Sequence, residues 1–126
     1  MEELLRKAEG YIYENGSSFQ KACIGCIAGR ESIRKVRDEL SAYQNPDGGW
    51  ANGLEIEYGG PVSSPFTTAA ALGYISKFGL GESDLLSSTL TYLKNTQHES
   101  GMWDDTDEML EYSHPPYMGP GIYIEY

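Results

Sequence analysis

The sequence predicts an all-α chain in which pairs of helices are joined by a repeated turn. Apolar residues recur at helical spacing through much of the 126 residues. The turn Tyr43-Gln-Asn-Pro-Asp-Gly-Gly-Trp50 returns in altered form as Thr96-Gln-His-Glu-Ser-Gly-Met-Trp103, 53 residues further along. A repeat of this length is typical of stacked supersecondary units, since one unit alone cannot bury its apolar face.

The two turns share a glutamine, a glycine and a tryptophan at the same spacing. These residues are Gln44, Gly48, Trp50, Gln97, Gly101 and Trp103. The chain has 2 tryptophans, and both stand at equivalent repeat positions. A glutamine amide can bond the unpaired backbone groups at helix ends, and glycine lets the chain reverse beneath an indole ring. We therefore expect these six residues to be structural, with each tryptophan in contact with its glutamine.

The N-terminal third reads as three helices. The first covers residues 2–14 and stops at Asn15-Gly16. Ser17 and Ser18 can cap the second, which carries an apolar stripe along one side. The third runs from about residue 31 to 43 and leads into the first turn.

The rest of the chain repeats the plan of turn, loop and helix. Residues 51–64 read as an ordered acidic loop, and Ser64-Pro65 supplies a cap and a proline at the first helical position. The helix that follows, 65–78, is small or apolar almost all round and is expected to be buried on most sides. A last amphipathic helix covers residues 85–96 and enters the second turn.

Length and charge limit the classes of function. We expect one domain over residues 1–126. No apolar run approaches the roughly 20 residues needed to cross a membrane, and a cytoplasmic location follows as the default. The net charge of −10 arises within residues 44–126, which disfavours a nucleic-acid partner. Simple solubility also explains this charge.

The turns, with the segment Gly53-Leu54-Glu55 and the Ser64-Pro65 start, resemble the α/α-toroid repeats of terpenoid cyclases and protein prenyltransferases. In that superfamily the recurring turn is known as the QW motif. The chain is most similar to bacterial proteins described as prenyltransferase and squalene-oxidase repeat proteins. The resemblance implies an incomplete α/α toroid, with turns at 43–50 and 96–103. It also implies an apolar, isoprenoid-like ligand.

We also expect the chain to form only part of a toroid. Toroids close as a ring of helix pairs, and this chain supplies only two turns. The apolar stretch Ile122–Tyr126 reads as the start of another inner helix. We expect either a fragment of a longer toroid or a homo-oligomer that covers the open apolar face.

The densest acidic cluster is Asp104–Glu108. Class II terpene cyclases protonate their substrate with an Asp-x-Asp-Asp motif, and Asp105-Thr106-Asp107-Glu108 differs from it at one residue. The resemblance makes Asp105 and Asp107 candidate catalytic acids. Alternatively, Asp104, Asp105 and Asp107 offer oxygen ligands for a divalent cation. A solvated acidic loop is the simplest interpretation.

Cys23 and Cys26 have the spacing of redox or zinc sites. No second cysteine pair and no βαβ context accompany them, so core cysteines on an apolar stripe are expected. The zinc ligands of the protein prenyltransferases have no recognisable counterparts, which argues against prenyl transfer. His98 and His114 stand apart from any nucleophile.

Two functions therefore remain open. The first is a repeat domain that binds an apolar small molecule or a protein partner without catalysis. The second is an isoprenoid cyclase that uses the acidic cluster Asp104–Glu108. The environment of these carboxylates, an enclosed aromatic cavity or open solvent, distinguishes the two.

Overall fold

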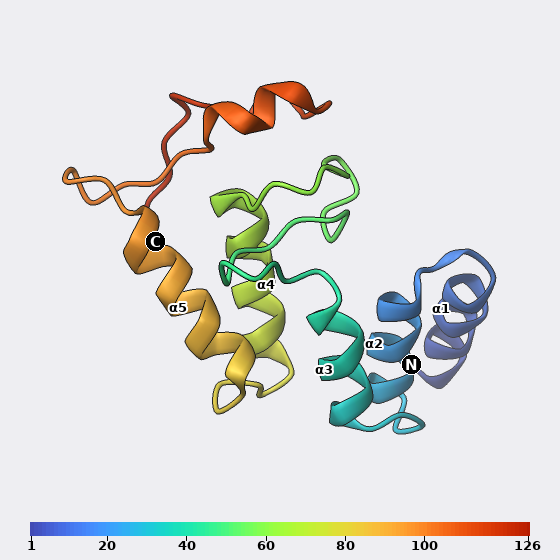
Figure 1. Cartoon of the computed structure of the whole chain (residues 1–126). Helices are drawn as coiled ribbons and strands as arrows, with labels where there is room; N and C mark the ends of the chain where they lie inside the picture. The colour runs from blue at the N-terminus through green and yellow to red at the C-terminus, as the bar shows by residue number, and fades with distance from the viewer. The chain divides into compact units, whose positions relative to one another are not determined.

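The computed structural model describes residues 1–126 and contains five α-helices, one short 3-10 helix and no β-strand (Figure 1). The helices are α1 (Glu2–Asn15), α2 (Ser18–Ile27), α3 (Ile33–Ser41), α4 (Pro65–Lys77), α5 (Asp84–Thr96) and η1 (Asp107–Glu111). The all-α prediction is confirmed, and each expected helix lies within a few residues of its predicted range. None of the helices combines the length and apolar character that crossing a membrane requires.

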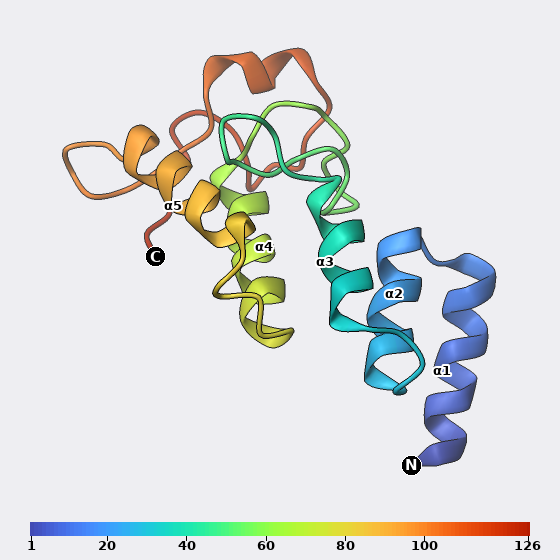
Figure 2. The same ribbon diagram turned by 60° about the horizontal axis from the view of Figure 1, so that its bottom comes forward.

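The chain divides into two compact units, residues 1–42 and 43–126, within the range that the sequence predicts as one domain. In the first unit α1 packs against α2, and α2 packs against α3 (Figure 2). Ser17 begins α2 through a capping box with Gln20, in which each side chain bonds the other residue's backbone N–H. This pairing satisfies two N–H groups that a helix start leaves open.

The two cysteines of the first unit lie on α2. Cys23 and Cys26 are half-buried and form no disulfide. Their neighbours on the same helix, Phe19, Ala22 and Ile24, are buried. This placement agrees with cysteines that contribute to an apolar helix face.

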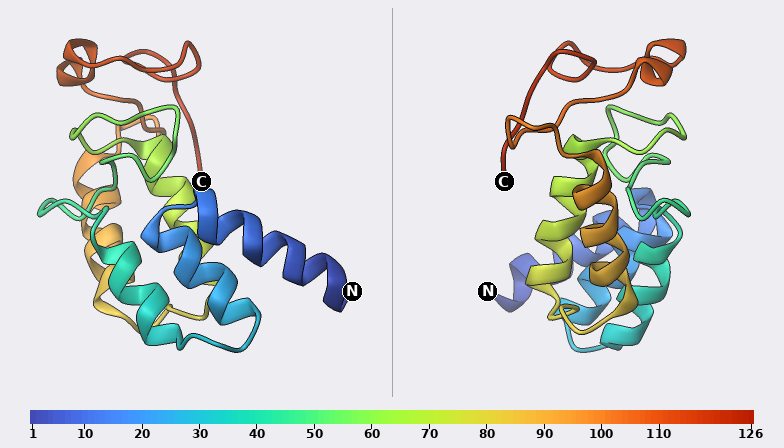
Figure 3. Two further views of the ribbon diagram at one scale, coloured as in Figure 1. Left: turned by 90° about the vertical axis from the view of Figure 1, so that its right-hand side faces the viewer. Right: turned by 60° about the vertical axis from the view of Figure 1, so that its left-hand side comes forward.

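In the second unit α4 and α5 lie side by side (Figure 3). Ser64 caps α4 by accepting the N–H of Phe66, and Pro65 takes the first helical position, as predicted. One side of α4 is buried, with Thr67, Thr68 and Ala71 at 0 % exposure. As predicted, most of the helix surface is covered: ten of its 13 residues are buried or half-buried, and the exposed ones are Gly73, Ser76 and Lys77. Within its unit the helical neighbour of α4 is α5.

The first Gln/Gly/Trp turn is locked by its own backbone and by its glutamine. The N–H of Asn45 donates to Gly49, and the N–H of Gly48 donates to Asn45. Gln44 Nε2 donates to the Gly48 carbonyl at 3.1 Å, and an antiparallel bridge joins Gln44 to Trp50. Gly48 has φ of +89°, a left-handed conformation that glycine adopts without strain.

The second turn repeats the two backbone bonds and the glutamine bond of the first. The N–H of His98 donates to Met102, the N–H of Gly101 donates to His98, and Gln97 Nε2 donates to the Gly101 carbonyl at 2.9 Å. Gly101 also has φ of +89°. The predicted equivalence of the two turns is therefore visible in the hydrogen bonds. Both glutamines bond a carbonyl inside their own turn, and Gln44 also bonds the Leu85 carbonyl of α5. The Trp103 indole donates to the Leu93 carbonyl in the last turn of α5.

Each turn is followed by a loop that returns to the tryptophan. The carbonyl of Trp50 accepts the N–H of Ser64, and the carbonyl of Trp103 accepts the N–H of Ile124. Residues 122–126 are not helical, so the expectation that an inner helix starts there is wrong. The antiparallel pairing of Ile124 with Trp103 holds this segment in an extended conformation instead. The Tyr126 ring packs edge-on against Trp103, with centroids 4.8 Å apart.

The two glycines give a matched test of the repeat. A Cβ added at Gly48 would lie 2.0 Å from the Ser88 carbonyl oxygen, whereas one at Gly101 would meet no atom closer than 3.9 Å. Gly101→Ala should cost only the left-handed backbone strain, about 1–2 kcal/mol. Gly48→Ala adds a backbone clash and should cost about 3–5 kcal/mol. Urea unfolding followed by tryptophan fluorescence measures both losses. Equal losses would contradict the packing of the first turn on α5.

Candidate functional site

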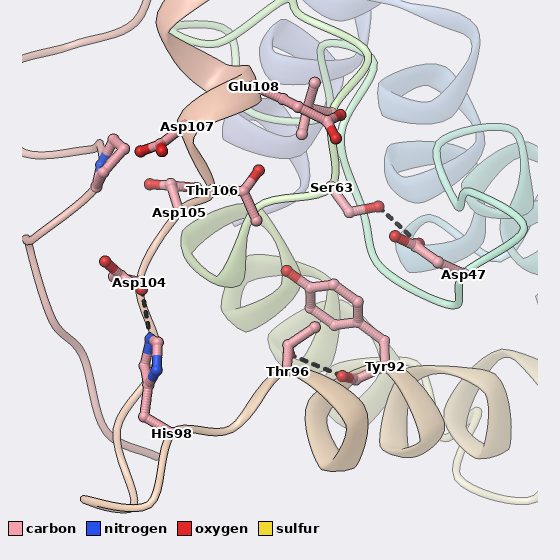
Figure 4. Close-up of a pocket in the computed structure, with 12 residues that line it drawn as sticks. Asp47, Ser63, Tyr92, Thr96, His98, Asp104, Asp105, Thr106, Asp107 and Glu108 are labelled. Atoms are coloured by element: carbon pink, nitrogen blue, oxygen red, sulfur yellow. Dashed lines mark hydrogen bonds and ion pairs between the residues drawn. The ribbon is translucent and has the colours of Figure 1, made fainter.

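A cavity of the second unit lies beside the two turns and has a volume of about 470 Å³. It is lined by Asp47, Val62, Ser63, Tyr92, Thr96, His98, Asp104, Asp105, Thr106, Asp107, Glu108 and Pro120. Figure 4 shows the Asp104–Asp107 stretch on one side and Asp47 and Ser63 on the other. The cavity has five carboxylates and no lysine or arginine. The structure thus brings the predicted acidic cluster to a concave surface.

Asp105 is the buried member of the cluster, with 2 % of its surface exposed. Its Oδ2 accepts the N–H of Gly119 at 2.8 Å. Burial raises the pKa of the Asp105 carboxyl, and the charge of Asp104 adds to the rise. The Ser64 hydroxyl and the Gly119 N–H oppose the shift without cancelling it. A raised pKa is one of the properties that a general acid needs.

The pKa of the Asp104 carboxyl is shifted in the opposite direction, below its ordinary value. Its Oδ1 lies 2.5 Å from His98 Nε2, and its Oδ2 accepts the N–H of Gly121 at 2.7 Å. Burial alone would raise the pKa of Asp104, but the hydrogen bonds from Gly121 and His98 and the electrostatic attraction of His98 lower it overall. Together, Asp104 and Asp105 hold the Gly119–Gly121 segment against the loop that follows Trp103.

Asp107 and Glu108 occupy the first turn of η1 and are exposed. Acidic residues favour a helix start, and Met109 beside them is fully buried and anchors the short helix. No three His, Cys, Asp or Glu side chains of the structure are grouped so that they would hold a metal ion. Asp104, Asp105 and Asp107 share the cavity without converging on one point, and a divalent cation there stays a prediction.

The sequence did not indicate two members of the cavity wall, Asp47 and His98. Asp47 reads as a turn residue, yet its Oδ1 accepts the N–H of Gly49 and the hydroxyl of Ser63. His98 stands at the repeat position of Asn45, and both side chains bond the loop that follows their turn. Alignment of the two repeats could have found this role, since the residue after each glutamine points to the returning loop.

Comparison with known proteins gives two relatives of the same kind. A squalene–hopene cyclase of Bradyrhizobium diazoefficiens is 35% identical over 79 residues, which is 58% of this chain and 12% of that protein. A protein of Sinorhizobium fredii named "Probable squalene–hopene cyclase" is 37% identical over 79 residues, again 12% of its length. This chain is related to the terpenoid cyclases.

The relationship is partial. The match spans about an eighth of each cyclase, and no model of a known protein family matches the chain. It confirms the superfamily that the Gln/Gly/Trp turns and the Ser64-Pro65 start indicated. The closed ring of a complete toroid stays a prediction, since the structure shows the helices and turns of an all-α fold without ring closure.

The raised pKa of Asp105 leads to a prediction about how the stability of the chain depends on pH. Because its folded-state pKa is raised above the ordinary 3.8, the folded chain binds this proton more tightly than the unfolded chain. The free energy of unfolding should therefore fall as pH rises from about 4. Asp105→Asn keeps an acceptor for Gly119 and removes the titration, so its stability relative to wild type should increase with pH.

Urea unfolding at several pH values between 4 and 8 measures this difference. Asp107→Asn, at an exposed position of the same cavity, is the matched control. A stability difference for Asp105→Asn that stays constant across the series would show that its carboxyl titrates normally.

Proposed function

We propose that this chain is a terpenoid-cyclase-like repeat segment that binds an apolar, isoprenoid-like molecule along the exposed side of α4. The relationship to proteins named for squalene, an apolar hydrocarbon, supports the ligand class. Since the match spans 12% of such a protein, binding rather than a complete reaction is the activity that we assign to the chain.

The observation that carries this proposal is a groove on α4. Its volume is about 310 Å³, and it is lined by Glu55, Ala70, Gly73, Tyr74 and Lys77. A Cβ added at Gly73 would meet nothing within 4 Å, so the floor of the groove is open at this glycine. An isoprenoid chain can lie over Ala70 and Gly73 and pack against the Tyr74 ring, because these residues offer apolar surface.

Filling the groove tests the proposal. Gly73→Leu places a side chain in open space and replaces a helix-interior glycine, so it should stabilise α4 by about 0.5–1 kcal/mol. The same substitution should weaken binding of farnesol, a soluble isoprenoid probe, at least tenfold. Titration with observation of the α4 backbone amides by NMR measures the affinity.

Gly10→Leu on α1 is the matched control, since a Cβ at Gly10 also meets nothing within 4 Å. It should gain similar helix stability and leave farnesol binding unchanged. Equal affinity of both variants and wild type, or no saturable binding at all, would exclude the groove as the site.

A second candidate function is acid-initiated cyclisation, which the burial and raised pKa of Asp105 favour. In this step the Asp105 carboxyl gives its proton to one carbon of a substrate double bond. The neighbouring carbon becomes a cation, and Asp105 is left as a carboxylate. Asp107 lines the same cavity and would supply the second carboxylate. The polar lining of this cavity suits a carbocation less well than aromatic rings would, so this function ranks second.

Product analysis tests the second candidate. Incubation of the chain with squalene, followed by gas chromatography and mass spectrometry, should reveal cyclised hydrocarbons that Asp105→Asn abolishes. Farnesol binding by Asp105→Asn should be retained, since the α4 groove does not include Asp105. Absence of cyclised products from the wild-type chain would remove catalysis and leave the binding proposal intact.

A further inference from the structure

The acidic cavity beside the two turns contains a carboxylate oxygen that has no partner. Asp105 has 2 % of its surface exposed, and its Oδ2 accepts the N–H of Gly119. Its other oxygen, Oδ1, is buried and accepts no hydrogen bond. The Ser64 hydroxyl lowers the pKa of this carboxyl from nearby, but it does not reach hydrogen-bond geometry with Oδ1. An unpaired buried oxygen of this kind is costly, and a donor bound in the cavity would remove the cost.

Most carboxylates of this cavity also lack a counter-ion. Asp104 has His98 beside it, whereas no lysine or arginine lines the cavity. The carboxylates that form no ion pair are Asp47, Asp105, Asp107 and Glu108. A concave surface lined by charges of one sign concentrates ions of the opposite sign. The charge of the cavity therefore favours a cationic ligand.

The arrangement of the carboxylates favours an extended cation over a compact one. They are spread over two walls, and they do not gather around one point as the ligands of a metal ion would. Tyr92 lies between Asp105 on one wall and Asp47 on the other (Figure 4). Burial raises the pKa of the Tyr92 hydroxyl, and the charges of Asp47 and Asp105 add to the rise. Both carboxylates are thus close enough to Tyr92 for one elongated ligand to pass over its ring.

We propose that this cavity binds a linear polyamine, with one ammonium group on Asp105 Oδ1 and another on Asp47 across the cavity. An ammonium group carries three donors and no acceptor, which suits an unpaired carboxylate oxygen. The methylene chain between the two ends packs on the Tyr92 ring, whose face also attracts a cation. A volume of about 470 Å³ is typical of small-molecule sites. This site is separate from the α4 groove, so either proposal can fail without the other.

Two cations of equal charge test the shape of the site. Spermidine is a linear trication, whereas hexaamminecobalt(III) carries the same charge and N–H donors on a compact ion. Isothermal titration calorimetry with the full chain is done at about 0.15 M salt, where attraction to distant surface charges is screened. It should show one spermidine per chain, bound at least tenfold more tightly than hexaamminecobalt(III).

Amide variants locate the two ends of the ligand. Asp105→Asn and Asp47→Asn each remove one charge and keep an acceptor oxygen for the backbone N–H that the carboxylate bonds. Each should weaken spermidine binding at least tenfold. Glu82→Gln removes the same charge at an exposed position outside the cavity, so this matched control should leave the affinity unchanged. Circular dichroism shows whether each variant is folded, and the comparison of the two trications on the wild-type chain needs no variant.

Three results would overturn the proposal. The first is the absence of saturable spermidine binding to the wild-type chain. The second is equal affinity for the two trications, which would show that net charge alone attracts them. The third is a spermidine affinity that the folded Asp105 and Asp47 variants lower no more than Glu82→Gln does, which would place the cation outside the cavity.

Discussion

The second unit depends on one hydroxyl group, that of Thr89 on α5. Its Oγ1 accepts the Trp50 indole N–H at 2.8 Å and the Gln44 amide at 3.3 Å, and it donates to the Leu85 carbonyl at 2.6 Å. Thr89 is fully buried, so these bonds use all the capacity of the hydroxyl without water. Two donors from the turn meet at one acceptor on a helix 39 residues away. A buried donor without a partner costs about 1–3 kcal/mol. Moving the turn away from Thr89 would leave the Trp50 and Gln44 donors unpaired, so this cost holds the turn in place on α5.

The carboxylates of the cavity serve the fold as well as the site. Asp104 and Asp105 accept the backbone N–H groups of Gly121 and Gly119, and Asp47 closes the first turn through Gly49. Asp105 does this from a buried position that raises its pKa, whereas the Gly121 N–H and His98 lower the pKa of Asp104. Adjacent residues with opposite pKa shifts are a common property of catalytic sites, and they also arise from structural contacts alone.

Local sequence signals predicted the helices well. The caps at Ser17 and Ser64, the proline at position 65 and the glycines of both turns act through neighbouring backbone, and each was found where expected. The register of the two turns was readable because both tryptophans fall at equivalent positions. The superfamily followed from the same residues.

Contacts between segments that lie far apart in the sequence could not be predicted from the sequence. The extended conformation of residues 122–126 comes from pairing with Trp103. The pairing of His98 with Asp104 and the place of Asp47 in the cavity wall arise when two loops meet. The periodicity and residue spacing within one segment carry no information about its contacts with another loop.

The dependence of the first turn on Thr89 also orders the assembly of the chain. The turn can form its internal bonds as soon as residues 43–50 exist, but Trp50 has no partner for its indole until α5 has folded. During synthesis the ribosome must add about forty further residues, which takes several seconds at ordinary elongation rates. The second turn is different, because its indole bonds Leu93, ten residues earlier in the chain. Because α5 precedes Trp103 in the chain, the Trp50 indole gains its partner before the second turn has been made, and the two repeats can close in chain order.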